Sequence, residues 1–74
     1  MKVLRDPIMG EFWIDEKAGK VWHITRSPGR KGKEKISKMR FKGFKHEKEA
    51  YEYLSSVFGV SVWKLRGMVR DEEI

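Results

Sequence analysis

The alternation of hydrophobic and polar residues predicts three β-strands in the first two thirds of the chain. In residues 11–15, Phe12 and Ile14 fall on one face and Trp13 on the other, which is the two-residue period of a strand. We therefore expect Trp13 to face away from the core, in a strand that begins near Ile8. The same period predicts two further strands, over residues 21–26 and 35–41.

The second of these strands has hydrophobic side chains on both faces. Trp22 and Ile24 share one face, and Val21 shares the other with His23 and Thr25. We place Trp22 and Ile24 in the core, because larger apolar side chains contribute more when they are buried. His23 and Thr25 are then expected on the exposed face of the sheet.

Glycine and proline mark the connections between the strands. Residues 16–19 have the length of a hairpin turn, in which Gly19 can adopt a positive φ angle. The Gly- and Pro-rich stretch at residues 27–33 predicts a mobile loop. Asp6 followed by Pro7 favours a turn before the first strand. We expect a single domain whose ends are frayed, at residues 1–7 and 71–74.

The hydrophobic pattern changes to a helical period after the third strand. Leu54 and Phe58 recur on one face of a predicted helix over residues 46–58. Gly59 suits the left-handed position that ends such a helix, and a shorter helix is predicted over residues 62–70. The predicted fold class is α+β: an antiparallel three-stranded β-sheet packed on an α-helix, with a short second C-terminal helix.

Composition limits the chemistry that this chain can support. Its 74 residues have room for one small domain without an extensive catalytic cleft, so we do not expect an enzyme. There is no Cys, and His23 and His46 alone are a poor ligand set, so no metal or other cofactor is predicted. No apolar run approaches the roughly 20 residues that cross a bilayer, and residues 1–10 lack a hydrophobic signal segment. The composition predicts a cytoplasmic protein without a membrane partner.

Positive charge is concentrated in one part of the chain. Residues 26–45 contain nine Lys or Arg residues and one acid, Glu34, a local balance of +8 in a molecule of net charge +6. A basic segment in an otherwise slightly acidic chain is typical of a surface that binds nucleic-acid phosphates. Alternate residues of a strand project together, which favours a binding role for Lys38, Arg40 and Lys42. The preceding basic groups of the predicted DNA-binding surface are Arg26, Arg30, Lys31 and Lys33.

Several motifs resemble those of a known DNA-binding family. A G-K-x-W-x-I run begins at Gly19, a basic strand follows, and a G-F-K-x-E-K-E-A-x-E-Y-L run begins at Gly43. Over residues 12–58 the chain resembles the arm-type DNA-binding domain of phage and transposon tyrosine integrases, to which the plant ethylene-response-factor domain is related. The residues that carry the resemblance are Gly19, Lys20, Trp22, Ile24, Gly43, Phe44, Lys48, Glu49, Ala50, Tyr53 and Leu54.

The resemblance implies that the exposed face of the sheet enters the major groove of double-stranded DNA while the helix packs behind it. We expect the resemblance to concern binding and not strand exchange, because these 74 residues do not include a recombinase catalytic domain. We expect a regulator or accessory factor, encoded by a phage or mobile element, that binds DNA by sequence or by structure. Transferred by position, the binding face comprises Trp13, His23, Thr25, Lys38 and Arg40.

A helix-turn-helix is a second interpretation of the C-terminal part. Gly59 would occupy the turn, and residues 62–70 would form a recognition helix with the β-hairpin as a wing. The simpler interpretation is that Leu65 and Val69 cover the open end of the core. In the helix-turn-helix case the residues presented to DNA would be Trp63, Lys64, Arg66 and Arg70.

Two other kinds of partner remain open. The basic face could dock on an acidic host protein, as a small viral inhibitor would, and the charge pattern serves that role equally well. RNA or single-stranded nucleic acid would instead use exposed aromatic side chains, on which unpaired bases stack.

Overall fold

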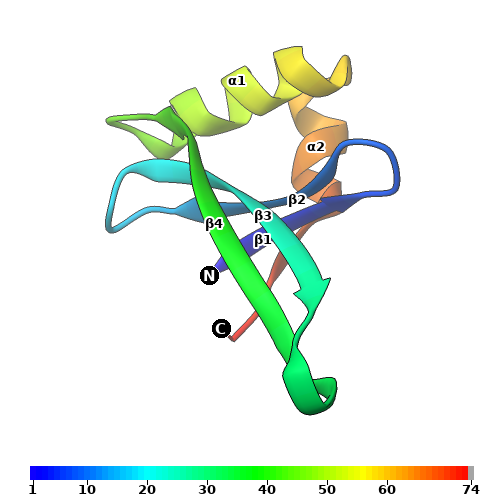
Figure 1. The fold of residues 1–74 in the computed structure, drawn as a ribbon. Helices are drawn as coiled ribbons and strands as arrows, with labels where there is room; N and C mark the ends of the chain where they lie inside the picture. Colours follow the sequence, from blue (N-terminus) through cyan, green and yellow to red (C-terminus); the bar gives the residue numbers. More distant parts are fainter. Residues whose placement is uncertain (74) are drawn as a thin grey trace.

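The computed structural model describes residues 1–73 of the chain, which fold as an α+β domain (Figure 1). Five strands form the sheet: β1 (Lys2–Asp6), β2 (Gly10–Asp15), β3 (Lys20–Pro28), β4 (Glu34–Gly43) and β5 (Val69–Asp71). The remaining elements are a 3-10 turn between β3 and β4, η1 (Arg30–Gly32), and two helices, α1 (Glu47–Phe58) and α2 (Val62–Met68). The predicted α+β class is confirmed.

The sheet has two more strands than the sequence predicts. Its order is β4-β3-β2-β1-β5, and every neighbouring pair is antiparallel. The three predicted strands correspond to β2, β3 and β4, and β1 lies between β2 and β5. The expected turn at Pro7 is present, because the Asp6 carboxylate accepts hydrogen bonds from the backbone N–H groups of Ile8 and Met9, at 2.9 and 2.6 Å. That turn follows a strand of the sheet and does not merely lead into it.

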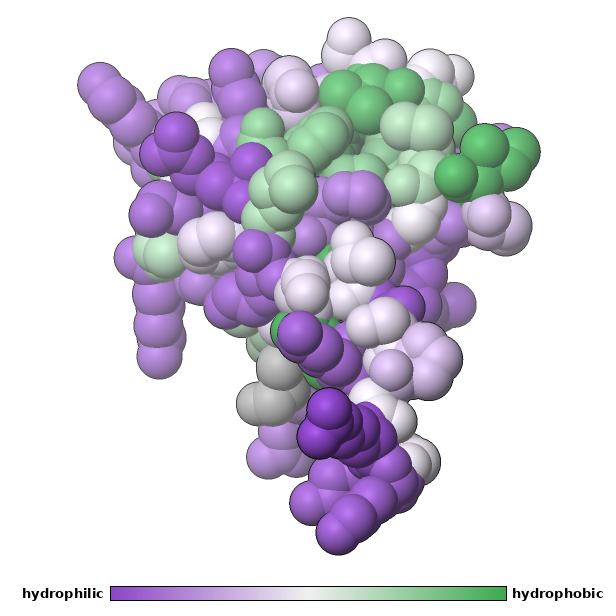
Figure 2. Space-filling model, viewed as in Figure 1, coloured by the Kyte–Doolittle hydropathy of each residue, from purple (hydrophilic) through white to green (hydrophobic). Residues whose placement is uncertain are grey.

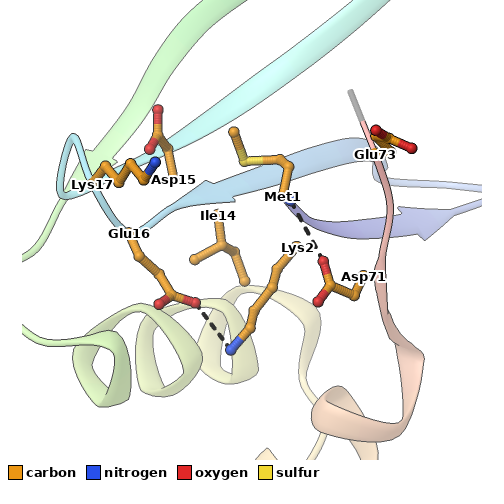
Figure 3. Close-up of a pocket in the computed structure, with 8 residues that line it drawn as sticks. All are labelled: Met1, Lys2, Ile14, Asp15, Glu16, Lys17, Asp71 and Glu73. Atoms are coloured by element: carbon orange, nitrogen blue, oxygen red, sulfur yellow. Dashed lines mark hydrogen bonds and ion pairs between the residues drawn. The ribbon is translucent and has the colours of Figure 1, made fainter.

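Both ends of the described chain are held in the sheet, so the expected fraying of residues 1–7 is wrong. Val3 and Leu4 are 1% and 0% exposed, and they pack on opposite faces of β1. Asp71 ends β5 and pairs with the N-terminal amine at 3.5 Å, and the Glu72 N–H donates to the first carbonyl of the chain at 2.9 Å. The amine and Asp71 line an open hollow of about 660 Å³, together with other charged residues of both signs. Figure 3 shows the two groups among the residues that line it. Of the C-terminal residues expected to fray, Ile74 lies outside the described residues.

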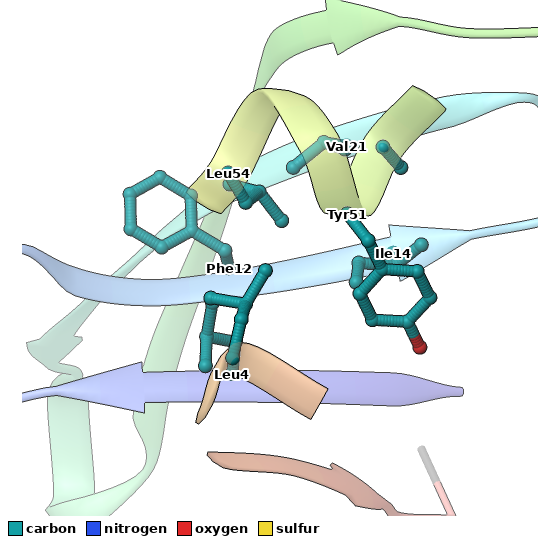
Figure 4. Packing of buried hydrophobic residues seen from close by; sticks show 8 residues of the cluster. Leu4, Phe12, Ile14, Val21, Tyr51 and Leu54 are labelled. Atoms are coloured by element: carbon teal, nitrogen blue, oxygen red, sulfur yellow. The ribbon is translucent and has the colours of Figure 1, made fainter. Parts of the chain in front are cut away.

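The helices cover one face of the sheet, and the larger hydrophobic core lies between the helices and the sheet (Figure 4). Phe12, Ile14 and Leu54 are at most 2% exposed, as the hydrophobic pattern predicts. A buried side chain of this size stabilises the fold by about 2 kcal/mol, so these contacts hold α1 on the sheet. The complete buried cluster is Leu4, Phe12, Ile14, Val21, Ala50, Tyr51, Leu54 and Leu65.

The side chains of β3 point to the opposite faces of the sheet from those predicted. Val21 is 0% exposed and belongs to the helix-side core, whereas Trp22 and Ile24 lie on the opposite face of the sheet. His23 stacks on the ring of Phe12 with centroids 4.9 Å apart, so it shares the helix side with Val21. Because the first residues of β3 are covered on both faces, their two-residue period does not identify the side that meets the helix.

The helices begin and end close to their predicted positions, with one exception. Gly59 adopts a φ angle of 66° and ends α1, as expected for a left-handed C-cap. The Ser61 hydroxyl caps α2 by accepting a hydrogen bond from the backbone N–H three residues later, at 3.2 Å. The exception is the helix predicted over residues 62–70, because α2 ends at Met68 and Arg70 belongs to β5. Neither helix within residues 1–73 is long and apolar enough to cross a membrane.

Strands β3 and β4 extend beyond the rest of the sheet as a two-stranded arm (Figure 1). We define the arm as residues 25–40, all of which are exposed except Gly29. The strands pair as far as Pro28 and Glu34, so the mobile loop predicted over residues 27–33 is reduced to a short turn around η1. Figure 2 shows that the surface of the arm is hydrophilic, whereas hydrophobic surface gathers beside α1.

Replacing Leu4 by Ala is expected to lower the free energy of unfolding by about 2 to 5 kcal/mol, because the change removes a fully buried side chain. Ile8→Ala is the matched control, since Ile8 is 91% exposed in the turn between β1 and β2, and its loss should change stability by less than about 0.5 kcal/mol. Urea unfolding followed by tryptophan fluorescence measures both values. Small losses of equal size in both variants would mean that β1 is not part of the folded sheet.

Candidate nucleic-acid interface

Within residues 1–73, no helix packs on one face of the sheet. Directly opposed residues of an antiparallel sheet share a face, and the strand register places one row of five residues across β5, β1, β2, β3 and β4: Arg70, Val3, Trp13, Trp22 and Arg40. Val3, Trp13 and Trp22 form a hydrophobic cluster separate from the helix-side core. We name this surface the open face. An arginine stands at each end of its central row, on the two outer strands.

The centre of the open face is a small apolar floor. Val3, Trp13 and Ile24 are 1%, 4% and 4% exposed, and Trp22 packs against them half-buried. The Lys38 ammonium lies 4.8 Å from the centroid of the Trp22 ring and 5.8 Å from that of Trp13, a cation–π geometry. Trp13 does lie on the face opposite the helices, as predicted. It forms part of the floor, however, and does not offer an exposed ring for DNA.

A chain of alternating charges crosses the open face beside this floor. The Glu11 carboxylate accepts hydrogen bonds from Nε and Nη2 of Arg26, at 2.8 and 3.1 Å, and Nε of Arg5 lies 3.6 Å from it. Arg5 also donates to Glu72 at 2.9 Å, and Arg26 donates to Glu34 at 3.2 Å. The ion pairs therefore connect β1, β2, β3 and β4 with the segment that follows β5.

Glu11 is the centre of this charge chain. It is 9% exposed, and its carboxylate accepts a third hydrogen bond from the Trp13 indole Nε1, at 2.6 Å. The hydrogen bonds from Arg26 lower the pKa of the Glu11 carboxyl, burial opposes them because it disfavours the charged form, and the Trp13 hydrogen bond lowers the pKa further. The same contact raises the pKa of Arg26. Glu11 is therefore a fixed anion at neutral pH.

This network assigns Arg26 a role different from the one predicted from the sequence. Its guanidinium is bound by the carboxylates of Glu11 in β2 and Glu34 in β4. A guanidinium held in this way is not free to bind phosphate without breaking two ion pairs. Arg26 instead holds the base of the arm against β2 and so sets the direction in which the arm projects.

Eight other basic residues of the arm and the open face form no ion pair within residues 1–73. The arm turns tightly between its strands, where Lys31 adopts a φ angle of 59° and Gly32 one of 76°. The basic residues near this tip are Arg30, Lys31, Lys33 and Lys35. Those on the open face are Lys20, Lys38, Arg40 and Arg70.

Three residues predicted for the binding surface lie on the helix side of the sheet. His23 stacks on Phe12, and Thr25 follows it on the same face of β3, so the reversed facing of this strand moves both. Lys42 is opposed to Val21 of the helix-side core, and a break in the register of β3 and β4 separates it from the alternation of the arm. These three residues do not join Lys38 and Arg40.

The residues of the alternative recognition helix do not form one surface. Trp63 is 87% exposed on α2, Lys64 beside it is exposed, and the Arg66 guanidinium lies 5.0 Å from the centroid of a tyrosine ring in α1. Arg70 is on the open face, in β5. Leu65 is 0% exposed, so α2 closes the helix-side core, as the simpler interpretation of this segment expects.

The sequence interpretation missed the roles of Glu11 and Lys20 on the open face. The period of β2 puts Glu11 on the same side as Trp13, but nothing local indicates that its partner is Arg26, fifteen residues away. Lys20 lies two residues before Trp22, a spacing that does indicate a shared face, and its ammonium is 5.5 Å from that ring. This spacing places Lys20 on the open face only if Trp22 is known to lie on that face.

Replacing Glu11 by Gln is expected to lower the free energy of unfolding at neutral pH by about 1 to 3 kcal/mol, because the buried Trp13 indole and the Arg26 guanidinium lose a charged acceptor. The pKa of Glu11 is lower in the folded chain than its ordinary value of 4.5, so the carboxylate stabilises the fold above that pH. This contribution is lost as the pH falls through the lowered pKa. The difference in stability between wild type and Glu11→Gln should therefore shrink in acid.

Denaturant unfolding at neutral pH and at about pH 3 measures this difference. Glu52→Gln is the control, because Glu52 forms only an exposed helical pair with Lys48, at 4.0 Å, which contributes little to stability. A difference for Glu11→Gln that stays constant into acid would contradict the role given to this carboxylate.

Neither metal ligands nor known relatives assign a chemistry to this surface. Within residues 1–73, no group of three or more His, Cys, Asp or Glu residues could hold a metal ion. No family model, no curated protein and no solved structure matches the chain. What the chain binds must therefore be inferred from the charge and geometry of the open face and the arm.

Proposed function

We propose that this chain binds double-stranded DNA, with the arm in the major groove and the open face of the sheet toward the duplex. The observation that carries the proposal is the set of eight basic residues on the arm and open face that form no ion pair within residues 1–73. The helix-side core lies on the other side of the sheet. The protein would act as a regulator or accessory factor.

Unpaired cations are what phosphate binding requires. Each Lys or Arg that neutralises a phosphate releases condensed counterions, which makes association favourable and dependent on salt. Arg5 and Arg26 are already bound to carboxylates and are excluded from this role. Around the tip of the arm, Arg30, Lys31 and Lys33 are exposed, so they suit contacts to the DNA backbone.

The dimensions of the arm suit the major groove. Neighbouring strands lie about 4.8 Å apart, and the major groove is about 12 Å wide and admits a two-stranded β-ribbon. Lys38 and Arg40 are opposed to Ile24 and Trp22, so both project from the open face. Side chains of these two types read guanine through its N7 and O6 acceptors.

Protection of a sheet edge is a simpler explanation for part of this charge. Strand β4 has ten residues and lies at the edge of the sheet, where Lys side chains hinder pairing with another chain. That explanation accounts for Lys35 and Lys38. The same explanation applies to Arg70, because β5 is the other edge strand of the sheet. Edge protection does not account for the basic tip of the arm or for Lys20 on β3, whereas phosphate binding accounts for all of these residues.

Single-stranded nucleic acid and RNA are less well supported, because no aromatic ring that residues 1–73 place on the open face is free. Trp13 is 4% exposed, and the Trp22 ring is approached by the ammonium groups of Lys38 and Lys20. Stacking of unpaired bases requires an accessible ring. Trp63 is accessible, but it lies on α2 and not on the open face.

The proposal agrees with what the resemblance to the arm-type DNA-binding domain implies, which is a sheet that faces DNA with a helix behind it. In this chain β1 and β5 widen the sheet beyond the three strands of that arrangement. An acidic protein surface could use the same cations, and the binding experiment distinguishes the two partners.

The variant Lys38→Ala/Arg40→Ala is expected to weaken binding to duplex DNA by about tenfold or more and to alter sequence preference, because it removes the two groove-facing cations of β4. Fluorescence anisotropy with labelled duplexes at two salt concentrations measures the affinity, and site selection measures the preference. The control is Lys17→Ala/Lys48→Ala, which removes the same charge from the β2–β3 turn and from α1. It should weaken binding much less.

The outcomes separate the alternatives. Equal losses in the two double variants would mean that net charge alone attracts DNA, without a defined face. Stronger binding of wild type to single-stranded DNA or RNA than to duplex would replace the duplex by that ligand. A preference that is lost in Lys64→Ala/Arg66→Ala but kept in Lys38→Ala/Arg40→Ala would favour α2 as the reading element. Absence of binding to every nucleic acid would leave the acidic protein partner.

A further inference from the structure

We propose that Arg70 forms a second contact with DNA, to a phosphate on the backbone that borders the groove occupied by the arm. This inference rests on the proposed function, and it extends the binding surface from the arm to the opposite edge of the sheet. Duplex DNA has two backbones at a fixed separation. The chain would bind them through basic residues on its two outer strands, whose separation is also fixed.

The position of Arg70 follows from the pairing of β5 with β1. Val69 is opposed to Leu4 and Arg70 to Val3. Leu4 belongs to the helix-side core, whereas Val3 belongs to the floor of the open face. Arg70 is therefore on the open face, in the same row as Arg40, although 30 residues and both helices separate the two in the chain.

The separation of the two arginines exceeds the width of the groove. Four inter-strand steps of about 4.8 Å lie between β4 and β5, which puts Arg40 and Arg70 about 19 Å apart along the sheet. The major groove is about 12 Å wide, so it cannot contain both. With the arm in the groove, Arg70 lies beyond its margin, where the phosphates run.

The guanidinium of Arg70 is free to make such a contact. Arg70 is exposed and forms no ion pair within residues 1–73. The acids that follow it in the chain have other partners, since Asp71 pairs with the N-terminal amine and Glu72 with Arg5. The local acidic sequence therefore does not neutralise Arg70.

The spacing between Arg40 and Arg70 is set before DNA binds. Backbone pairing joins all five strands, and the packed side chains of Val3, Trp13 and Trp22 fill the row between the arginines. A surface that needs no rearrangement loses little conformational entropy on binding. The second contact thus adds to affinity without adding to sequence preference, because phosphates are the same in every sequence.

The test is the salt dependence of duplex binding by Arg70→Ala. Loss of one phosphate contact should reduce the slope of log K against log salt concentration by about 0.9. The loss of affinity should be equal for every duplex sequence. The preferred DNA site should stay unchanged. Arg70→Lys keeps the charge and should restore the slope, and Lys64→Ala, on α2, is the matched control that should leave it unaltered.

The outcomes distinguish failure of the proposed function from failure of the Arg70 contact. If wild type and all variants fail to bind duplex DNA, the proposed function is wrong and this inference falls with it. If Lys38→Ala/Arg40→Ala weakens binding while Arg70→Ala retains the wild-type slope, the proposed function stands and the contact at Arg70 is overturned. A changed site preference in Arg70→Ala would also overturn it, because Arg70 would then read bases. Thermal unfolding of Arg70→Ala should match that of wild type, which excludes a loss of folded protein.

Discussion

The ion pair between Glu11 and Arg26 is the contact on which the open face depends. Glu11 is 9% exposed and accepts hydrogen bonds from Arg26 and from the Trp13 indole. A buried carboxylate without donors would be strongly destabilising, so these partners have to stay in place. The Glu11 carboxylate orients the Trp13 ring through the hydrogen bond from its indole, and it holds the base of the arm through Arg26. The apolar floor and the basic arm are therefore fixed relative to each other by one carboxylate.

The two faces of the sheet have different roles: one packs against the helices, and the other is accessible to a partner. The helix side carries the larger core, in which α1 and α2 cover Leu4, Phe12, Ile14 and Val21. The open face carries a floor of three almost fully buried residues, surrounded by charged side chains. A domain of this size has little apolar area to spare, and the second cluster stabilises the sheet without a second layer of helices. This arrangement leaves a rigid basic surface accessible to a partner.

Paired and unpaired cations lie close together on that surface, and their different surroundings give them different roles. Arg5 and Arg26 are neutralised by Glu72, Glu11 and Glu34, and they hold strands together. The cations on the two outer strands, such as Arg40 and Arg70, have no such partner within residues 1–73 and suit phosphate binding. Total charge would not distinguish these groups, because every one of them is a basic residue within a β-strand.

The sequence by itself determined the features that depend on neighbours along the chain. Gly59 ends α1 and Ser61 caps α2 because a cap acts on backbone groups within one helical turn. The alternation of Phe12 and Ile14, the turn at Gly19 and the concentration of positive charge in residues 26–45 are local in the same sense. They were enough for the α+β class, the strands β2 to β4 and a basic hairpin.

Only the tertiary structure decided which residues share a face and which charges meet. Strand β1 is five residues long with one buried side chain on each face, so its local pattern is weak, and it is stabilised by pairing with β2 and β5. Val21 and Trp22 are both apolar, and only packing against α1 selects Val21 for the helix side. Arg70 reaches the open face by pairing with Val3, across nearly the whole length of the chain. Side-chain periods repeat locally, whereas strand pairing and ion pairs join distant segments, and their energies depend on the complete fold.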